Sequence, residues 1–175
     1  MTTYVAFLRA INLGATRKFP KEAIVAATEA AGFTGVATHI NTGNVRLETS
    51  MRSRARIEAA LEDAYLADRG FAVPTMVYRT DELRVVVDDA DRLGEGHDGK
   101  HYVWLLKDAP SEAVRRELEG LSTARERVGV SERAVHLLVD DGYLQATLLK
   151  PVEKRVGVCT NRNVTVLRAL AAKWS

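Results

Sequence analysis

The sequence is poor in cysteine, in aromatic residues and in long apolar runs. Its one cysteine, Cys159, excludes an internal disulfide and any metal site built from several cysteines. A lone thiol of this kind is typically a small buried side chain. No apolar stretch approaches the roughly 18 residues of a membrane span, and no charged and then apolar leader opens the chain. We therefore expect neither a membrane span nor a secretory signal, and a cytoplasmic, reducing location.

Catalytic signatures are also missing. The chain contains none of the short motifs of serine hydrolases, phosphate-binding loops, zinc proteases or dinucleotide-binding domains. Residues of metal-ligating type gather in one glycine-rich stretch: Asp91, Glu95, His97, Asp98 and His101. Such a stretch favours a solvated loop over a metal site. His39 and His136 are interpreted as hydrogen-bonded structural residues. We expect no catalytic residue, no metal and no cofactor.

Charge is distributed unevenly along the chain. Residues 1–21 carry four basic side chains and no acid, and residues 150–175 carry six basic side chains against one acid. Because the whole chain has a net charge of +2, the segment between these ends carries −7. If the two ends meet in the fold, they form a basic face that favours an anionic partner; otherwise these are dispersed, solvated charges.

The periodicity of apolar residues predicts an α+β fold with two ferredoxin-like subdomains packed into one compact unit. The first subdomain, residues 1–90, follows the order β-α-β-β-α-β and ends with a short helix. Its first strand is apolar on both faces, which predicts a central place in the sheet. The expected elements are strands 3–9, 36–40, 45–48 and 73–79 and helices 20–31, 52–66 and 80–90.

The second subdomain, residues 101–175, follows a glycine-rich connection, residues 91–100. The expected elements are strands 101–107, 127–130 and 134–139 and helices 110–121 and 164–174. Residues 144–157 are ambiguous, because Pro151 interrupts a helical pattern, and we place a helix from about Pro151. The polar string Thr160-Asn-Arg-Asn163 is expected to cap the last helix.

Two polar clusters are the candidate ligand-binding residues. The first combines the end of the first strand with a hairpin turn, and the second precedes the last helix. The candidates are Arg9, Asn12, Asn41, Thr42, Asn44, Arg162 and Asn163. Amides, hydroxyls and guanidinium groups bind anions but supply no acid or base that titrates near neutral pH. The alternative is that the asparagines cap turns and the arginines pair with buried carbonyls or acids.

These strings resemble a known family. Val5-Ala-Phe-Leu-Arg-Ala-Ile-Asn-Leu-Gly14, Gly32-Phe33, Thr38-His-Ile-Asn-Thr-Gly-Asn-Val45 and Thr160-Asn-Arg-Asn163 are similar, in this order and over nearly the whole chain, to DUF1697, a bacterial domain of unknown function. The chain departs from the family pattern at Ala10, Ala15, Thr42, Val164 and Val166, where the family has two glycines, a serine, a tryptophan and a threonine. The resemblance implies a small cytosolic α+β protein with two ferredoxin-like subdomains, no established activity and no catalytic residue to carry over.

Three functions are compatible with the sequence. The leading one is a non-catalytic binder of a phosphate-bearing small molecule or of a nucleic-acid backbone; an aromatic content of 6% disfavours reading of RNA sequence by base stacking. The second is a small-molecule enzyme in which Arg9 holds the substrate and His39 acts as base. The third is a structural or self-association module, and the sequence leaves a monomer and a dimer both open.

Overall fold

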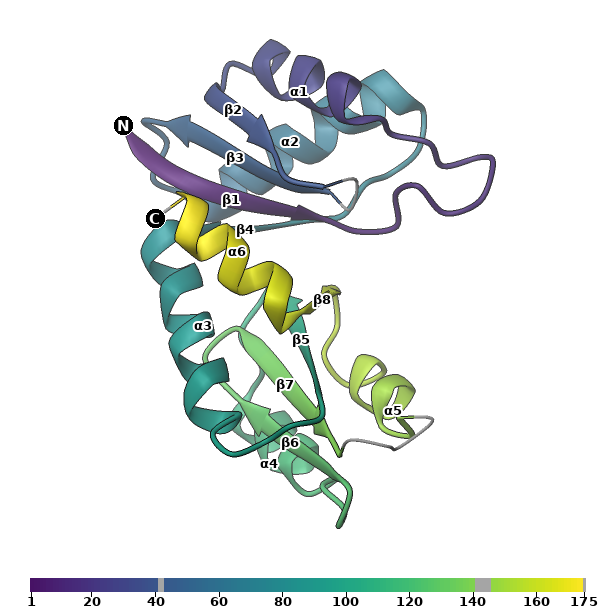
Figure 1. The fold of residues 1–175 in the computed structure, drawn as a ribbon. Coiled ribbons are helices and arrows are strands. Elements are labelled where there is room, and N and C mark those ends of the chain that lie inside the picture. Colours follow the sequence, from purple (N-terminus) through teal and green to yellow (C-terminus); the bar gives the residue numbers. More distant parts are fainter. Residues whose placement is uncertain (41–42, 141–145, 175) are drawn as a thin grey trace. The chain divides into compact units, whose positions relative to one another are not determined.

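The structure, a computed structural model, describes residues 1–40, 43–140 and 146–174 and divides into two units, each presented by itself. Unit 1 comprises Met1–Leu83 with Trp174–Ser175, and unit 2 comprises Arg84–Lys173. Each unit contains one four-stranded antiparallel sheet (Figure 1). The strand orders, β2-β3-β1-β4 and β6-β7-β5-β8, are equivalent along the chain. The predicted α+β class with two ferredoxin-like subdomains is therefore confirmed.

The first sheet and its helices have the following bounds: β1 Thr2–Leu8, α1 Lys21–Ala30, β2 Thr34–Thr38, β3 Asn44–Thr49, α2 Arg54–Arg69, β4 Thr75–Arg79 and α3 Thr80–Leu93. β1 lies between β3 and β4, as its apolar pattern predicted. Alternate residues of β1 pack against α1 and α2, with Tyr4 and Ala6 in contact with a core that includes Ile24 and Leu61. Its intervening residues are buried as well, so β1 is apolar on both faces.

The remaining elements are β5 Lys100–Leu106, α4 Glu112–Glu119, β6 Glu126–Val130, β7 Ala134–Val139, α5 Leu149–Glu153, β8 Cys159–Asn163 and α6 Val164–Trp174. α3 reaches Leu93 and β5 begins at Lys100, so a helix end and a strand start lie within the segment 91–100 that was expected to be a connection. α5 starts two residues before Pro151, which places the proline in the first turn, where its missing N–H costs no intrahelical bond.

Among the strands of the described residues, β8 is the one that the sequence did not predict. Its residues pair with β5, with Thr160 opposite Leu105 and Arg162 opposite Val103. The expected cap of the last helix is nevertheless present, because the Asn163 side-chain oxygen accepts a hydrogen bond from the backbone N–H of Thr165 at 2.8 Å. The polar string is thus both an edge strand and a helix cap.

The two faces of the second sheet differ in chemistry. Trp104 and Leu137 belong to an apolar core that also contains residues of α4 and α5. The opposite face carries His101 and His136 and lies against the end of α3: a Cβ atom on Gly129 would approach Leu93 Cδ1 to 2.9 Å. Glycine at this position therefore allows α3 to pack closely on the sheet. Among the described residues, no helix is both long and apolar enough to cross a membrane.

Candidate functional site

The loop after β1 is held in shape by Asn12. This residue has φ 55°, a left-handed conformation that asparagine tolerates better than most residues. Its side-chain oxygen accepts a hydrogen bond from the Phe19 N–H at 2.9 Å, and its amide nitrogen donates to the Phe19 carbonyl at 3.3 Å. Its backbone N–H donates a hydrogen bond to the backbone carbonyl of Arg17 at 2.7 Å. Asn12 therefore closes the loop between β1 and α1.

Arg17 fixes the same loop from its other side. Its Nε donates to the Ala10 carbonyl and its Nη2 to the Ala72 carbonyl, both at 2.6 Å. Its guanidinium carbon lies 4.5 Å from the centre of the Phe71 ring, within the range of a cation–π contact. The charge of Arg17 thus contributes to the basic N-terminal end while its hydrogen bonds hold backbone in place.

A cavity of about 490 Å³ opens where this loop enters α1. Its lining comprises Asn12, Gly14, Lys18, Pro20, Lys21 and Glu22. Pro20 is the N-cap residue of α1 and has no side-chain acceptor for the first helical N–H groups. The N-terminus of α1 and two lysines, Lys18 and Lys21, therefore line one space together with a single acidic residue, Glu22. We refer to this space as the α1 pocket.

The predicted hairpin cluster lies beside the end of β1. The Leu8 N–H donates to the Gly43 carbonyl at 2.8 Å, which brings the hairpin next to Arg9 in the chain. Asn44 is fully buried, and its amide nitrogen donates to the His39 carbonyl at 3.1 Å. The backbone N–H of His39 donates to the Asn44 carbonyl, also at 3.1 Å. Asn44 thus closes the hairpin from inside, and His39, half-buried, is part of the same closure.

The other candidates are two residues outside the described ranges, one residue of unit 1 and two residues of unit 2. Asn41 and Thr42 lie outside the described residues. Arg9 contributes its backbone N–H to the Pro74 carbonyl at 2.9 Å. Arg162 and Asn163 belong to β8 in unit 2. A site shared by Arg9 and Arg162 stays a prediction.

Arg162 is a buried cation, with 8% of its surface exposed. Its Nη1 donates to the Thr160 hydroxyl and to the Asn161 carbonyl, each at 2.8 Å. Burial lowers the pKa of the guanidinium to about 10, which still leaves it charged at neutral pH. Both contacts lie within β8, so Arg162 helps to organise this strand.

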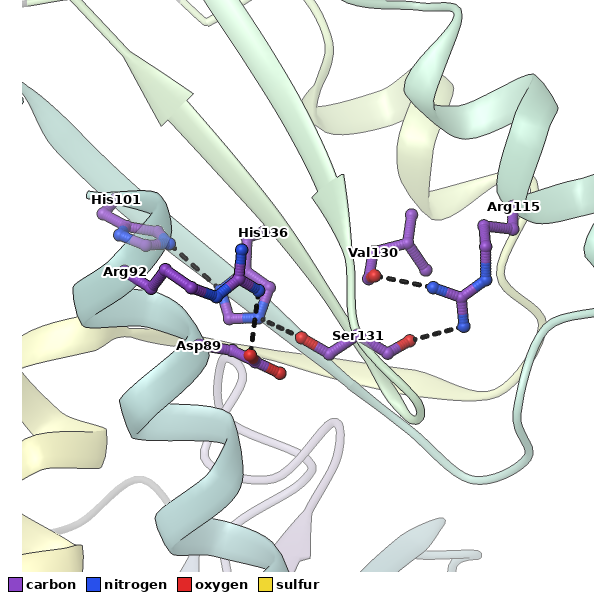
Figure 2. Close-up of polar contacts among 7 residues, drawn as sticks. All are labelled: Asp89, Arg92, His101, Arg115, Val130, Ser131 and His136. Atoms are coloured by element: carbon purple, nitrogen blue, oxygen red, sulfur yellow. Dashed lines mark hydrogen bonds and ion pairs between the residues drawn. The ribbon is translucent and has the colours of Figure 1, made fainter. Parts of the chain in front are cut away.

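Unit 2 also contains a polar array that the sequence did not predict (Figure 2). His101 Nε2 lies 3.1 Å from His136 Nδ1, and His136 Nε2 lies 3.0 Å from the Ser131 hydroxyl. Beside them, Arg92 Nη2 donates to Asp89 Oδ1 at 2.9 Å, both residues belonging to α3. The contacts of His136 join side chains of three different segments, β5, β7 and the β6–β7 turn. We call these residues the histidine array.

Burial controls the charges in the histidine array. It lowers the pKa of His101 to about 4 and that of His136 to about 3, so both imidazoles are neutral at pH 7. Burial alone would raise the pKa of Asp89, but hydrogen bonds from Arg92 and Ser131 outweigh it and lower that pKa. Asp89 is therefore ionised and can only accept hydrogen bonds.

The direction of the two hydrogen bonds of His136 depends on its tautomer, because each imidazole nitrogen donates in one neutral tautomer and accepts in the other. In either tautomer the hydrogen bonds of His136 link β5, β7 and the β6–β7 turn.

The turn that carries Ser131 is fixed from outside the array. Arg115 of α4 donates to the carbonyls of Val130 and Ser131 at 2.6 and 3.0 Å (Figure 2). His101 lies in β5, as the predicted strand 101–107 placed it, and is 6% exposed, so it is not part of a solvated loop. The interpretation of His136 as a hydrogen-bonded residue is confirmed. Among the described residues, no group of three metal-ligating side chains is close enough to hold an ion.

Together, the two antiparallel sheets with equivalent strand orders define an α+β protein with two ferredoxin-like units. The family model described as "Protein of unknown function (DUF1697)" matches residues 1–136, and the chain belongs to this family. The match covers Met1–Leu83 of unit 1 and extends into β7, so the resemblance of residues 160–163 to a family motif lies outside it.

One solved structure shares the fold over its whole length. The conserved bacterial protein SP0830 from Streptococcus pneumoniae is similar to this chain with a TM-score of 0.80 and 18% sequence identity, over 99% of this chain and 98% of that one. At this identity the likeness shows the fold alone. No curated protein matches the chain.

Proposed function

We propose that this protein is a non-catalytic binder of a phosphate-bearing anion, and that the α1 pocket of unit 1 receives the anion. The observation that supports this proposal is the combination of Lys18 and Lys21 with the N-terminus of α1 around one cavity of about 490 Å³. Helix N-termini bind phosphate through their N–H groups and dipole. The volume lies in the range of roughly 300–1,000 Å³ that is usual for small-molecule pockets.

The chemistry of the lining favours binding over catalysis. Ammonium groups and backbone N–H groups attract and orient an anion. Glu22 is the one acid among the lining residues. Its Oε1 lies 3.8 Å from Lys21 Nζ, and both side chains are largely exposed. A phosphorylated small molecule fits a space of this size better than an extended polymer does. A nucleic-acid backbone remains the second ligand to test, since it presents the same phosphate chemistry.

Calorimetric titration with inorganic pyrophosphate at low ionic strength tests the proposal. We expect saturable binding that weakens as salt is added. The variant Lys18→Ala with Lys21→Ala should lose about tenfold in affinity, because two exposed charge contacts together are worth roughly 1–2 kcal/mol. Lys154→Ala, which removes an exposed lysine from unit 2, is the matched control and should bind as the wild type does.

Two outcomes would contradict the proposal: no heat of binding at low salt, or equal affinity in the Lys18/Lys21 variant and the Lys154 control. The Arg9→Ala and Arg162→Ala variant addresses the extent of the site. A further loss of affinity would extend it to the other predicted residues, and unchanged affinity would confine the anion to the α1 pocket. Repeating the titration with single-stranded RNA compares the two ligand classes.

A further inference from the structure

Unit 2 contains a cavity of about 280 Å³ at the start of β6. Its polar lining includes His97, Ser122, Thr123, Arg125, Arg127 and Asp140. These residues belong to unit 2 and differ from those of the α1 pocket and of the histidine array. We call this space the β6 pocket.

The pairing of β6 with β7 brings two arginines of the pocket to one face of the sheet. Arg127 lies opposite Leu138, and the Asp140 N–H donates to the Arg125 carbonyl at 3.0 Å, which continues the same register. Side chains two residues apart on a strand share a face and are separated by about 6.6 Å along it. Arg125 and Arg127 therefore place two guanidinium groups on the same side, and both residues are exposed.

The acid between the two arginines is engaged on the other face of the sheet. Glu126 is 2% exposed, and its carboxylate accepts hydrogen bonds from the Thr147 hydroxyl and from the Leu148 N–H, the latter at 3.0 Å. Leu148 belongs to the apolar core that covers that other face. Among the lining residues, Asp140 is then the acid that shares a face with the arginines, so two cations oppose one anion.

The turn before β6 adds hydroxyl groups whose oxygens already accept hydrogen bonds. Thr123 Oγ1 accepts from the N–H groups of Arg125 at 3.2 Å and Glu126 at 3.0 Å. Ser122 Oγ accepts from the Val128 N–H at 3.0 Å. A hydroxyl has one hydrogen to donate and two lone pairs that accept. Because both lone pairs of Thr123 are used, its hydroxyl can only donate, which matches a ligand that only accepts.

Backbone contacts hold two further side chains of the pocket in place. Arg127 Nη2 donates at 2.6 Å to the carbonyl of Leu93, the last residue of α3. A guanidinium has five N–H groups, so this contact fixes Arg127 and leaves it able to donate to a ligand. His97 Nε2 lies 3.3 Å from the Lys100 carbonyl, which only accepts, so the ring donates from this nitrogen.

We propose that the β6 pocket binds a compact oxyanion, a carboxylate or a phosphate group, through Arg125, Arg127 and the Thr123 hydroxyl. Guanidinium groups donate two parallel hydrogen bonds to either kind of anion. The volume lies just below the roughly 300–1,000 Å³ of pockets for drug-sized ligands, which favours a molecule of few atoms. This site is in unit 2 and does not rest on the function proposed for the α1 pocket.

Two-dimensional NMR titrations of the isotope-labelled chain with sodium phosphate and with sodium succinate test the proposal. Sodium chloride keeps the ionic strength constant and low. We expect saturable shifts of the backbone amides of residues 122–127 with at least one of the two anions, and the one that binds more tightly identifies the ligand as a phosphate or a carboxylate. Amides of residues 14–22 report the α1 pocket separately, so the failure of one site is distinguished from the failure of the other.

The variant Arg125→Gln with Arg127→Gln tests the two guanidinium groups. It removes both charges, but a glutamine amide can still donate to the Leu93 carbonyl. Affinity should fall at least about tenfold, since charge-assisted hydrogen bonds are the stronger kind. Arg84→Gln with Arg116→Gln removes the same charge from exposed positions of unit 2 and should bind as the wild type does.

Three results would overturn the proposal. The first is the absence of a saturable shift at residues 122–127 with either anion. The second is the same shift in chloride alone, which would report screening of charge and no bound oxyanion. The third is equal affinity in the Arg125/Arg127 variant and in the Arg84/Arg116 control. The first two are read from the wild-type chain, so they decide the matter even where a variant fails to fold.

Discussion

At the scale of single residues, the polar side chains that the sequence singled out are mostly engaged with backbone. Asn12 binds both polar groups of Phe19, and Asn44 binds the carbonyl of His39. These contacts correspond to the alternative in which the asparagines hold turns. Lys18 and Lys21 of the α1 pocket are different, because they are exposed and line a cavity. Within unit 1, structure and proposed binding thus rest on different side chains.

The Asn44 amide is expected to stabilise the hairpin by more than a surface residue would. Asn44→Ala removes a fully buried amide and leaves the His39 carbonyl without this donor, which should lower the free energy of unfolding by about 1–3 kcal/mol. Asn44→Asp keeps the shape but replaces the donor by an acceptor that faces a carbonyl, so it should be at least as destabilising. Urea unfolding of both variants provides the measurement. Wild-type stability in Asn44→Asp would contradict the role of the N–H donor.

The histidine array makes unit 2 sensitive to acid. Both histidines have pKa values in the folded protein below the ordinary 6.5, so below that pH the unfolded chain binds protons that the native array does not. Their stabilising contribution is complete above about pH 6.5 and is lost as the pH falls toward 4. Between pH 7 and 5 the loss should be on the order of 2 kcal/mol per histidine.

Denaturant unfolding of unit 2 as a function of pH measures this effect. In His101→Gln with His136→Gln, the dependence on pH between 7 and 5 should flatten. His39→Gln, a half-buried histidine of unit 1, serves as control and should keep the wild-type slope. An unchanged slope in the double variant would show that other groups carry the acid sensitivity.

At the scale of helices and strands, the hairpin illustrates how a glycine positions the candidate loop. Gly43 has φ +73°, and a Cβ atom there would lie 2.8 Å from Leu8 Cβ and 2.9 Å from Ile11 Cδ1. Gly32 has a similar φ of +89° but open space around it. Comparing alanine substitutions at these two glycines therefore separates the energetic cost of a left-handed backbone from the cost of steric crowding.

Gly43→Ala should therefore destabilise more than Gly32→Ala does. Left-handed backbone costs a non-glycine residue roughly 1–2 kcal/mol, and crowding in a packed core adds about 1–3 kcal/mol. We expect the first cost alone for Gly32→Ala and both for Gly43→Ala, as measured by thermal or urea unfolding. Equal losses in the two variants would mean that the hairpin does not pack tightly against the end of β1.

Periodicity predicted most elements because their apolar residues recur regularly. β1, β5 and β7 are rich in apolar residues, and α1 and α2 show helical spacing, so these elements follow from the sequence. β8 has the sequence Cys-Thr-Asn-Arg-Asn, which lacks such a pattern. It forms a strand because β5 offers a free edge, which is a tertiary effect that local propensity does not contain.

The same limit applies to the candidate sites. The histidine array depends on the register that places Val103 opposite His136 and His101 opposite Leu138, and register is invisible before the strands are paired. The α1 pocket depends on how the loop folds back between Asn12 and Phe19. The sequence did indicate the basic segment 1–21 and the start of α1 near Pro20, which are the parts of that pocket visible locally.

At the scale of the whole molecule, two ferredoxin-like units with the same strand order carry different chemistry. Unit 1 combines a basic N-terminal segment with the α1 pocket. Unit 2 combines an apolar core on one sheet face with a buried polar array on the other. The fold repeats, but the polar side chains do not, so a function proposed for one unit does not transfer to the other.

The most direct test of anion binding locates the ligand on the molecule. Two-dimensional NMR spectra of the isotope-labelled chain, titrated with inorganic pyrophosphate, report each backbone amide separately. We predict saturable shifts concentrated at Gly14 and at residues 18–22, which are lost in the Lys18→Ala and Lys21→Ala variant. Shifts centred elsewhere, or no saturable shift at low ionic strength, would contradict the assignment of the α1 pocket as the binding site.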